Sequence, residues 1–181
     1  SPLSIEPRRQ WPRDVEQVRG NIPVELRLQD GRALSVLGDG GWGERVKAAR
    51  AAGEPYDDRL VGGAAQAITD RWRPEPAPTW VTVVPAEGPD AAHLVDLAAR
   101  LAERLGLPYV PALELTRSIE PQARRHNSAQ QVANLWGAYA VTGELPAGPV
   151  LLVDDVVDSR WTLTVAGAAL LDAGSGPVHP F

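Results

Sequence analysis

The sequence contains no cysteine and no methionine among its 181 residues, and phenylalanine occurs once. Without cysteine the chain can form no disulfide, no thiolate metal site and no cysteine nucleophile. It also lacks an apolar run near the ~20 residues of a membrane span, and its first residues lack the apolar core of a signal peptide. We therefore expect a cytoplasmic protein without a membrane partner. Because no methionine stands even at position 1, we also expect a domain that belongs to a longer chain.

Positively charged residues are outnumbered by negatively charged ones, 18 to 23. The net charge is −5 and the isoelectric point is about 5.2, so a broadly basic surface for nucleic acid is not expected. The arginines gather locally instead, at Arg8 and Arg9, at Arg13, and at Arg124 and Arg125. Apolar residues make up 44% of the chain, which is enough for a core, and the length suits one domain with an appendage.

The most informative stretch is 150–164, which reads VLLVDDVVDSRWTLT. Its first four residues, 150–153, are all apolar and predict a strand buried on both faces of a parallel sheet. Asp154 and Asp155 follow directly, then a short polar loop, and helical periodicity begins at Trp161. Open α/β sheets bind ligands at the carboxyl ends of their strands, and a helix N-terminus favours phosphate. The alternative is an ordinary strand, turn and helix with a solvated acidic turn.

The first 41 residues are typical of a linker or adaptor segment, because prolines interrupt them and basic residues cluster there. Residues 24–28 alternate before Asp30 and Gly31, which predicts either a hairpin or a strand, a turn and a short helix over 32–37. The glycine-rich run 38–43 predicts a hinge and lacks the Gly-Lys-Ser/Thr of a nucleotide-binding loop. Residues 42–181 are then the main domain.

Periodicity and stop signals give the order of the remaining elements. Strand and helix patterns alternate along the main domain, which predicts an α/β fold with a three-layer, parallel-dominated sheet and right-handed crossovers. The helices are expected over 44–52, 57–72, 91–105, 129–135 and 161–173, and the strands over 80–84, 109–115, 136–141, 150–153 and 178–181.

Residues 150–164 resemble the 5-phosphoribosyl-1-pyrophosphate (PRPP) motif of the type I phosphoribosyltransferases. That motif is an apolar strand, two acidic residues and a loop that ends in Thr-Gly-x-Thr. Asp154 and Asp155 match the acidic pair, and Ser159 and Thr162 match the two threonines. Arg160 stands where the family has glycine, a residue that adopts positive φ freely. The resemblance implies a type I phosphoribosyltransferase-like fold with an N-terminal linker or hood segment.

The resemblance also implies roles for individual residues. Asp154 and Asp155 would hold the ribose hydroxyls of PRPP, directly or through Mg²⁺. Asp158 would act as general acid or base and would share the phosphate-binding loop with Ser159, Arg160, Trp161 and Thr162. The family's pyrophosphate loop would correspond to Pro85 and Ala86, and the basic contacts of its mobile loop to Arg117, Arg124 and Arg125. The alternatives are a generic strand–helix loop and a run of solvated arginines.

A wider resemblance covers nearly all of residues 5–181. IEPRRQWP at 5–12 and DSRWT at 158–162 resemble the C-terminal region of actinobacterial RecQ-family ATP-dependent DNA helicases, where a phosphoribosyltransferase-like domain follows the helicase core. This resemblance implies the helicase core as a partner, and it allows DNA contacts through the basic N-terminal arm. No ATP-binding motif is present, so this chain alone is not expected to unwind DNA.

Three functions fit these patterns. We favour a regulatory accessory domain that binds PRPP or another phosphorylated ligand, such as a nucleotide or a DNA end, at 154–162. The runner-up is an active Mg²⁺-dependent phosphoribosyltransferase that acts on a base acceptor. The third is a structural appendage that contacts another subunit.

Overall fold

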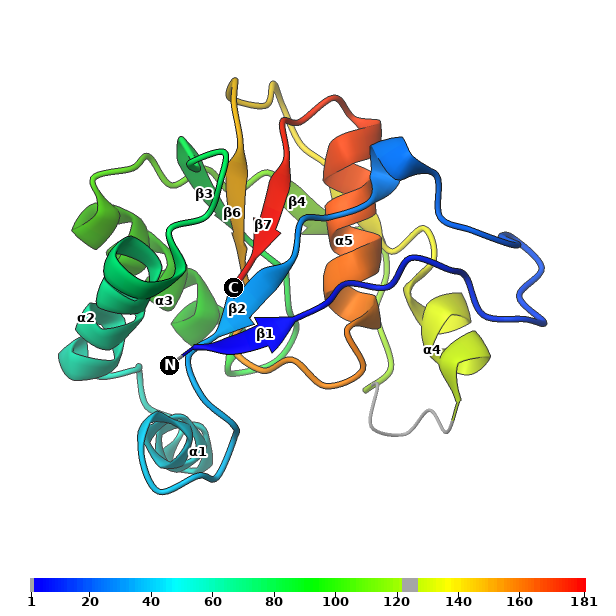
Figure 1. The fold of residues 1–181 in the computed structure, drawn as a ribbon. Helices are drawn as coiled ribbons and strands as arrows, with labels where there is room; N and C mark the ends of the chain where they lie inside the picture. Colours follow the sequence, from blue (N-terminus) through cyan, green and yellow to red (C-terminus); the bar gives the residue numbers. More distant parts are fainter. Residues whose placement is uncertain (1, 122–126) are drawn as a thin grey trace.

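A computed structural model describes residues 2–121 and 127–181 and has an α/β fold (Figure 1). At its centre is a parallel sheet in the order β3 (Trp80–Val83), β6 (Val150–Val153) and β7 (Val178–Pro180). All four residues of the middle strand, β6, are buried. A strand in the middle of a parallel sheet has both faces covered, which explains why β6 is continuously apolar.

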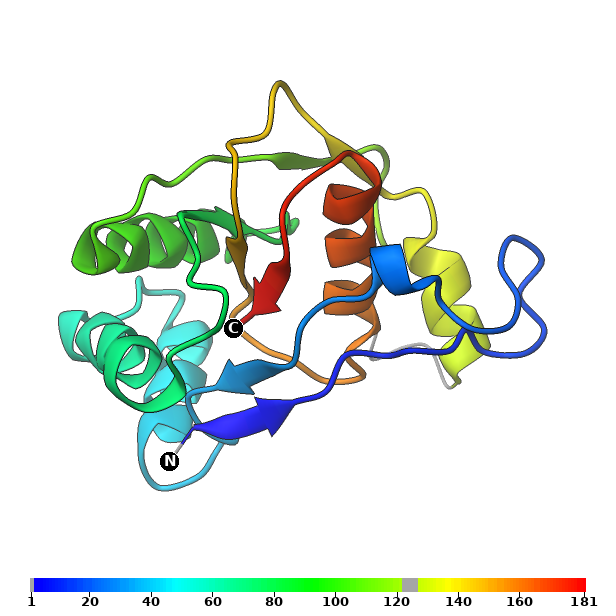
Figure 2. The same cartoon turned by 45° about the horizontal axis from the view of Figure 1, so that its top comes forward.

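Alternate residues of β6 enter two separate cores, because successive side chains point to opposite faces of a sheet. Val150 and Leu152 pack in one core with α5 (Trp161–Asp172). Leu151 and Val153 pack in the other with α2 (Asp58–Gln66) and α3 (Ala91–Leu105). Both views show α2 and α3 on one side of the sheet and α5 on the other, so the parallel sheet is the middle of three layers (Figures 1 and 2).

The expected α/β class is confirmed, but the parallel sheet is smaller than predicted. Residues 109–115 and 136–141 do not join it as full strands. They contribute β4 (Leu113–Leu115) and β5 (Tyr139–Val141), which pair antiparallel to each other. Tyr109 makes only an isolated bridge to Val81 of β3. Pro108 cannot donate the hydrogen bond that would extend this bridge toward Thr79, and on the other side the Ala112 N–H donates to the Thr82 hydroxyl instead.

The helices begin and end close to the expected residues. α1 (Trp42–Ala52) ends at Gly53, which has φ +65°. Asp57 caps α2 by accepting the Leu60 N–H at 2.8 Å, and a π-helical segment, Ala67–Trp72, continues this helix. Gly63 within α2 has a packing role, because a Cβ there would lie 2.6 Å from the Trp42 indole of α1. α4 (Ser128–Leu135) is capped by Asn127, whose side chain accepts the Gln130 N–H.

The N-terminal segment folds differently from either predicted arrangement. β1 (Leu3–Ile5) pairs antiparallel with β2 (Gly31–Ala33), so neither a hairpin within 24–33 nor a helix over 32–37 forms. A 3₁₀ turn, Val24–Leu26, replaces the alternating strand, and Val24 is 74% exposed. The local alternation was misleading because the partner of β2 lies at the start of the chain.

The first 41 residues also share the core on the α5 side of the sheet. Leu28 packs against Gly167 of α5 so closely that a Cβ there would lie 2.5 Å from its side chain. Trp11 stacks on Trp161, with 6.1 Å between the ring centroids. Five residues of the segment are buried in this core: Ile5, Trp11, Val15, Ile22 and Leu28. Within the described ranges, no helix has the length and apolar character needed to cross a membrane.

Candidate functional site

Asp154 and Asp155, here called the acidic pair, follow the central strand at the carboxyl edge of the parallel sheet. The Asp154 N–H donates to the Phe181 carbonyl at 3.0 Å, and the Val153 carbonyl accepts from Val84 N–H at 3.0 Å. These bonds continue the pairing of β6 with both neighbours to the last residue. The backbone of Asp154 is therefore fixed where an open α/β sheet binds ligands, and Asp155 follows it.

Two side chains from distant parts of the chain meet Asp155. The Tyr56 hydroxyl donates to Asp155 Oδ2 at 2.8 Å, and Arg50 of α1 donates to the same oxygen through Nη1. The Asp155 side chain is 11% exposed and that of Arg50 37%. We call this arrangement of Arg50, Tyr56 and Asp155 the latch, because it ties α1 to the loop after β6.

The two carboxyl groups have different electrostatic surroundings. Burial, and then the neighbouring charge of Asp155, raise the pKa of Asp154 well above its ordinary value. The Asp154 Oδ1 accepts the Asp155 N–H at 2.9 Å, which partly offsets this effect. Burial, and then the Asp155 carboxylate, also raise the pKa of Tyr56. The site thus combines a buried carboxyl group of raised pKa with a second carboxyl group that accepts donors from an arginine and a phenol.

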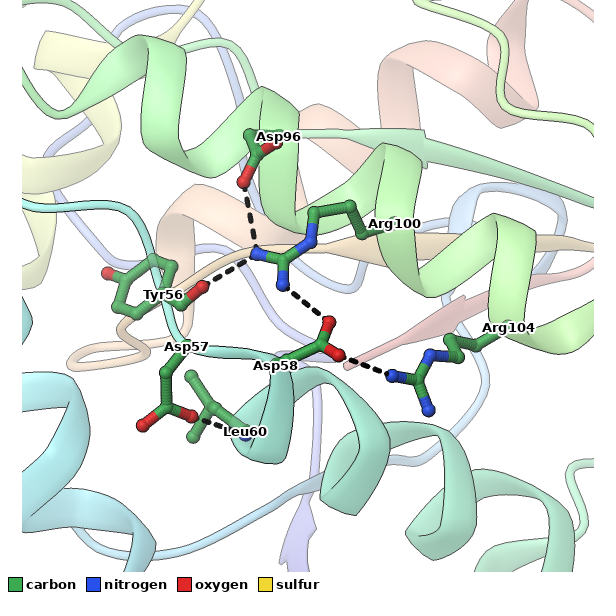
Figure 3. A network of polar contacts seen from close by, with 7 residues as sticks. All are labelled: Tyr56, Asp57, Asp58, Leu60, Asp96, Arg100 and Arg104. Atoms are coloured by element: carbon green, nitrogen blue, oxygen red, sulfur yellow. Dashed lines mark hydrogen bonds and ion pairs between the residues drawn. The ribbon is translucent and has the colours of Figure 1, made fainter.

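A polar network holds Tyr56 in position (Figure 3). Arg100 of α3 donates to the Tyr56 backbone carbonyl at 2.6 Å and to Asp58 at 2.8 Å. It also contacts Asp96 one turn earlier on α3, and Arg104 donates to the other Asp58 oxygen at 3.0 Å. The network joins the start of α2 to α3, so the phenol that reaches Asp155 belongs to a segment fixed at its backbone.

A cavity of about 120 Å³ opens beside the acidic pair. Val153 of β6 and Phe181, which follows β7, contribute to its wall, and the helices contribute apolar side chains. Its lining combines the acidic pair with Tyr56, the loop residues Val156 and Val157, residues 33–37 of the N-terminal segment except Val36, and apolar residues of α1, α2 and α3. A polar edge on an apolar chamber suits a ligand with hydroxyl groups at one end.

The loop from β6 to α5 brings the other predicted ligand residues to the start of the helix. Asp158 is exposed, whereas Ser159, Arg160 and Thr162 are partly buried. The Ser159 hydroxyl accepts the Trp161 N–H at 3.4 Å. Arg160 has φ +70°, so an arginine occupies the left-handed conformation that glycine adopts at lower cost. Its guanidinium turns to the N-terminal segment, where it donates to the Glu6 carbonyl at 2.9 Å.

Trp161 is part of the packing rather than of the cavity lining. Its side chain is 2% exposed, with Trp11 stacked beside it and the Arg8 guanidinium 5.1 Å from its ring centroid. The buried Nε1 atom has no hydrogen-bond partner among the described residues. Trp161 thus anchors the N-terminal segment on α5.

The other predicted contacts are distributed unevenly. Pro85 and Ala86 follow β3 at the same sheet edge as the acidic pair, because β3 and β6 are parallel with Val83 opposite Val153. Arg117 instead donates to the carbonyls of Asn134 and Trp136, where it closes the C-terminal end of α4. Arg124 and Arg125 lie outside the described residues.

The sequence patterns did not reveal Arg50, Tyr56 or Arg100 as parts of the site. Arg50 reads as the basic last turn of a helix, which favours the helix dipole without any further role. Tyr56 precedes the Asp57 cap and carries no motif. Their partners lie far away in the sequence, since Arg50 and Asp155 are 105 positions apart.

Comparison with protein-family models finds no match for this chain, and a search of curated proteins finds none either.

Proposed function

We propose that this chain is a ligand-binding module of phosphoribosyltransferase-like fold that takes PRPP or a related sugar phosphate at the acidic pair. We further propose that it works as a regulatory accessory domain of a RecQ-family DNA helicase, with the helicase core as its partner. The observation that carries the ligand proposal is the place of Asp154 and Asp155. They stand at the carboxyl edge of the central parallel strand, beside a cavity and before the loop that opens α5.

In this proposal the ribose hydroxyls of the ligand bind at the acidic pair, and its 5-phosphate binds at the start of α5. Asp155 is a carboxylate acceptor for vicinal ribose hydroxyls, which would exchange with the Arg50 and Tyr56 donors that now occupy Oδ2. The 5-phosphate would meet the backbone N–H groups of the α5 start and the hydroxyls of Ser159 and Thr162. The Arg160 side chain is directed to Glu6 and takes no part in this cradle.

Mg²⁺ does not fit the acidic pair as a site made by protein alone. Asp155 Oδ2 already accepts two donors, and burial favours the protonated form of Asp154. Across residues 2–121 and 127–181, no three acidic or histidine side chains gather into a metal-binding group. We propose that Mg²⁺ enters on the phosphates of the ligand, as it does in sites that use one or two carboxylates.

The test is a calorimetric titration of the chain with PRPP, with and without Mg²⁺, repeated with Asp155→Asn. We expect saturable binding that is weaker by about tenfold or more in the variant, because a charge-assisted hydroxyl acceptor is lost. Asp172→Asn, at the far end of α5, is the matched control and should bind as the original chain does. Equal affinity of Asp155→Asn and the original chain for PRPP would show that the acidic pair does not bind this ligand.

The runner-up is phosphoribosyl transfer, and one observation favours it. Two adjacent carboxyl groups with different environments are the arrangement that general acid–base catalysis needs. In such a reaction a ring nitrogen of a base acceptor bonds to the anomeric carbon, the bond to pyrophosphate breaks, and a carboxylate takes the acceptor's proton. Release of pyrophosphate from PRPP on addition of nucleobases would support phosphoribosyl transfer. Binding of PRPP without release of pyrophosphate would support the regulatory function instead.

A further inference from the structure

We propose that Arg8 and Arg160 form a binding notch for a terminal phosphate group, on the outside of the molecule and separate from the acidic pair. The notch is a hollow of about 480 Å³ lined by Glu6, Pro7, Arg8, Arg9, Asp30 and Arg160. It shares no lining residue with the cavity beside the acidic pair. The proposal therefore stands whether or not the acidic pair binds PRPP.

Reciprocal hydrogen bonds hold the two guanidinium groups at this place. Arg8 Nε of the N-terminal segment donates to the Ser159 carbonyl of the loop at 3.3 Å. Arg160 of the loop donates through Nη1 to the Glu6 carbonyl of the N-terminal segment at 2.9 Å. The Arg8 N–H also donates to the Thr164 hydroxyl at 3.2 Å. Each guanidinium thus uses one donor to fix its position.

The charges of the notch are unbalanced. Within the described residues, neither Arg8 nor Arg160 forms an ion pair, whereas Arg9 lies 3.5 Å from Asp30. Burial, and then the nearby Arg160 charge, lower the pKa of Arg8. Two like charges held side by side repel each other, and an anion between them relieves that repulsion.

The backbone of Arg160 adds an independent observation. This residue holds a left-handed conformation, which favours glycine, at the N-terminus of α5. A strained residue persists where its surroundings impose the conformation, and such residues cluster at ligand sites. At this position the strain is accompanied by a guanidinium in the notch.

The chemistry of the lining selects a single phosphate group. Guanidinium forks recognise phosphate oxygens in pairs, and two forks suit a phosphomonoester dianion. Glu6 and Asp30 also line the hollow, so three arginines face two carboxylates. An extended polyanion would meet those carboxylates, whereas a compact terminal phosphate can lie between Arg8 and Arg160 alone.

The position of Arg8 supplies a spectroscopic signal. Its guanidinium lies 5.1 Å from the Trp161 ring centroid, so an anion bound to Arg8 changes the electrostatic environment of that indole. Tryptophan fluorescence and phosphorus NMR line shifts can therefore follow a titration of the full chain with inorganic phosphate at low salt.

The decisive variants are Arg8→Gln and Arg160→Gly. The glycine variant removes the guanidinium and also the left-handed strain, so it should fold at least as readily. We expect phosphate affinity to fall by about tenfold or more in both variants. Arg19→Gln removes the same charge from an exposed site on the same segment and should change affinity by less than about twofold. Unchanged affinity in both notch variants, or no saturable binding at about 10 mM phosphate, would overturn the proposal.

The source of the phosphate is resolved by two further ligands. Ribose 5-phosphate represents small molecules, and a short single strand with a 5′-phosphate represents a nucleic-acid end. If Arg8→Gln no longer binds one of these ligands, the result supports the notch. The ligand whose binding is lost identifies the source of the phosphate. Equal binding of the strand with and without its terminal phosphate would contradict a site for terminal phosphate.

Discussion

Asp154 and Asp155 are adjacent in the chain, yet they differ in chemistry because their side chains meet different surroundings. Asp154 remains close to the sheet edge, where its Oδ1 accepts the next residue's N–H. Asp155 reaches away from the sheet to Arg50 and Tyr56. Burial, and then the neighbouring charge of Asp155, raise the pKa of Asp154 and favour its neutral form. This difference lets one residue hold a proton while the other accepts hydrogen bonds.

The raised pKa of Asp154 predicts how stability depends on pH. The folded chain binds this proton more tightly than the unfolded chain, whose carboxyl has a pKa near 3.8. Stability contributed by the proton is therefore complete at low pH and is lost as pH rises from that value toward the folded pKa. Asp154→Asn keeps the Oδ1 acceptor and removes the ionisation, so we expect it to be more stable than the original chain at about pH 8.

Urea denaturation at several pH values from about 4 to 8 measures this effect. The advantage of Asp154→Asn should shrink as the pH falls toward 4, because both chains are then neutral at this position. Asp172→Asn makes the same change at an exposed position on α5 and is the matched control. Parallel curves for Asp154→Asn and the original chain would mean that Asp154 ionises normally.

At the scale of elements, α1 is the least deeply packed helix near the site. Gly43 is its only buried residue, and the latch connects its last turn to the loop after β6. Trp42 against Gly63 joins its first turn to α2. By contrast, Arg100 binds the segment that carries Tyr56 directly to α3 (Figure 3). The acidic pair is thus covered by a segment bound to α3 and by a helix that Trp42, the Arg45–Asp57 ion pair and the latch attach to the rest of the domain.

We expect Arg50→Met to weaken the attachment of α1 and to remove one of the two donors that compete with ligand hydroxyls for Asp155 Oδ2. The partly exposed ion pair contributes about 1 kcal/mol to the free energy of unfolding, and its removal should speed hydrogen exchange in α1. PRPP affinity should rise severalfold, because the ligand no longer displaces an arginine. Lys47→Met, an exposed substitution on the same helix, is the control. Weaker PRPP binding in Arg50→Met would show that Arg50 serves the ligand instead of competing with it.

Across the whole molecule, a run of aromatic contacts unites the N-terminal segment with the domain. Trp11 stacks on Trp161 of α5 and meets the edge of Trp136, which follows α4, with 5.5 Å between centroids. The Arg8 guanidinium lies over the Trp161 indole, 5.1 Å from its ring centroid. The predicted boundary between an adaptor over 1–41 and a domain over 42–181 therefore crosses a shared apolar core.

This shared core predicts one cooperative unfolding transition. Trp11→Ala should lower the free energy of unfolding by about 3–5 kcal/mol, since a large buried ring leaves a cavity. Val24→Ala, at a side chain that is 74% exposed, should change it by less than about 0.5 kcal/mol. Urea denaturation followed by circular dichroism makes the comparison. If Trp11→Ala released the N-terminal segment while the rest kept its full stability, the chain would divide near residue 41 after all.

The sequence by itself determined the α/β class, the central buried strand, the acidic pair at its end and most helix boundaries. These features depend on neighbours within a few residues. The apolar run at 150–153 indicates a strand that is buried on both faces. The spacing of Leu94, Leu97 and Leu101 indicates the buried face of a helix, and Gly106 ends that helix with φ +69°. Local sterics and periodicity are enough to predict such elements.

Only the tertiary structure decided the pairing of β1 with β2, the latch, the direction of Arg117 and the meeting of Arg8 with Arg160. Each of these contacts joins segments whose approach depends on how the layers pack. Arg160 and Glu6 are 154 positions apart, and no local pattern specifies their separation in space. The sequence around an arginine does not indicate whether its side chain is solvated, binds the carbonyls at a helix end or lies near a second arginine. The packing of the folded chain, which brings distant backbone carbonyls within reach, determines which of these occurs.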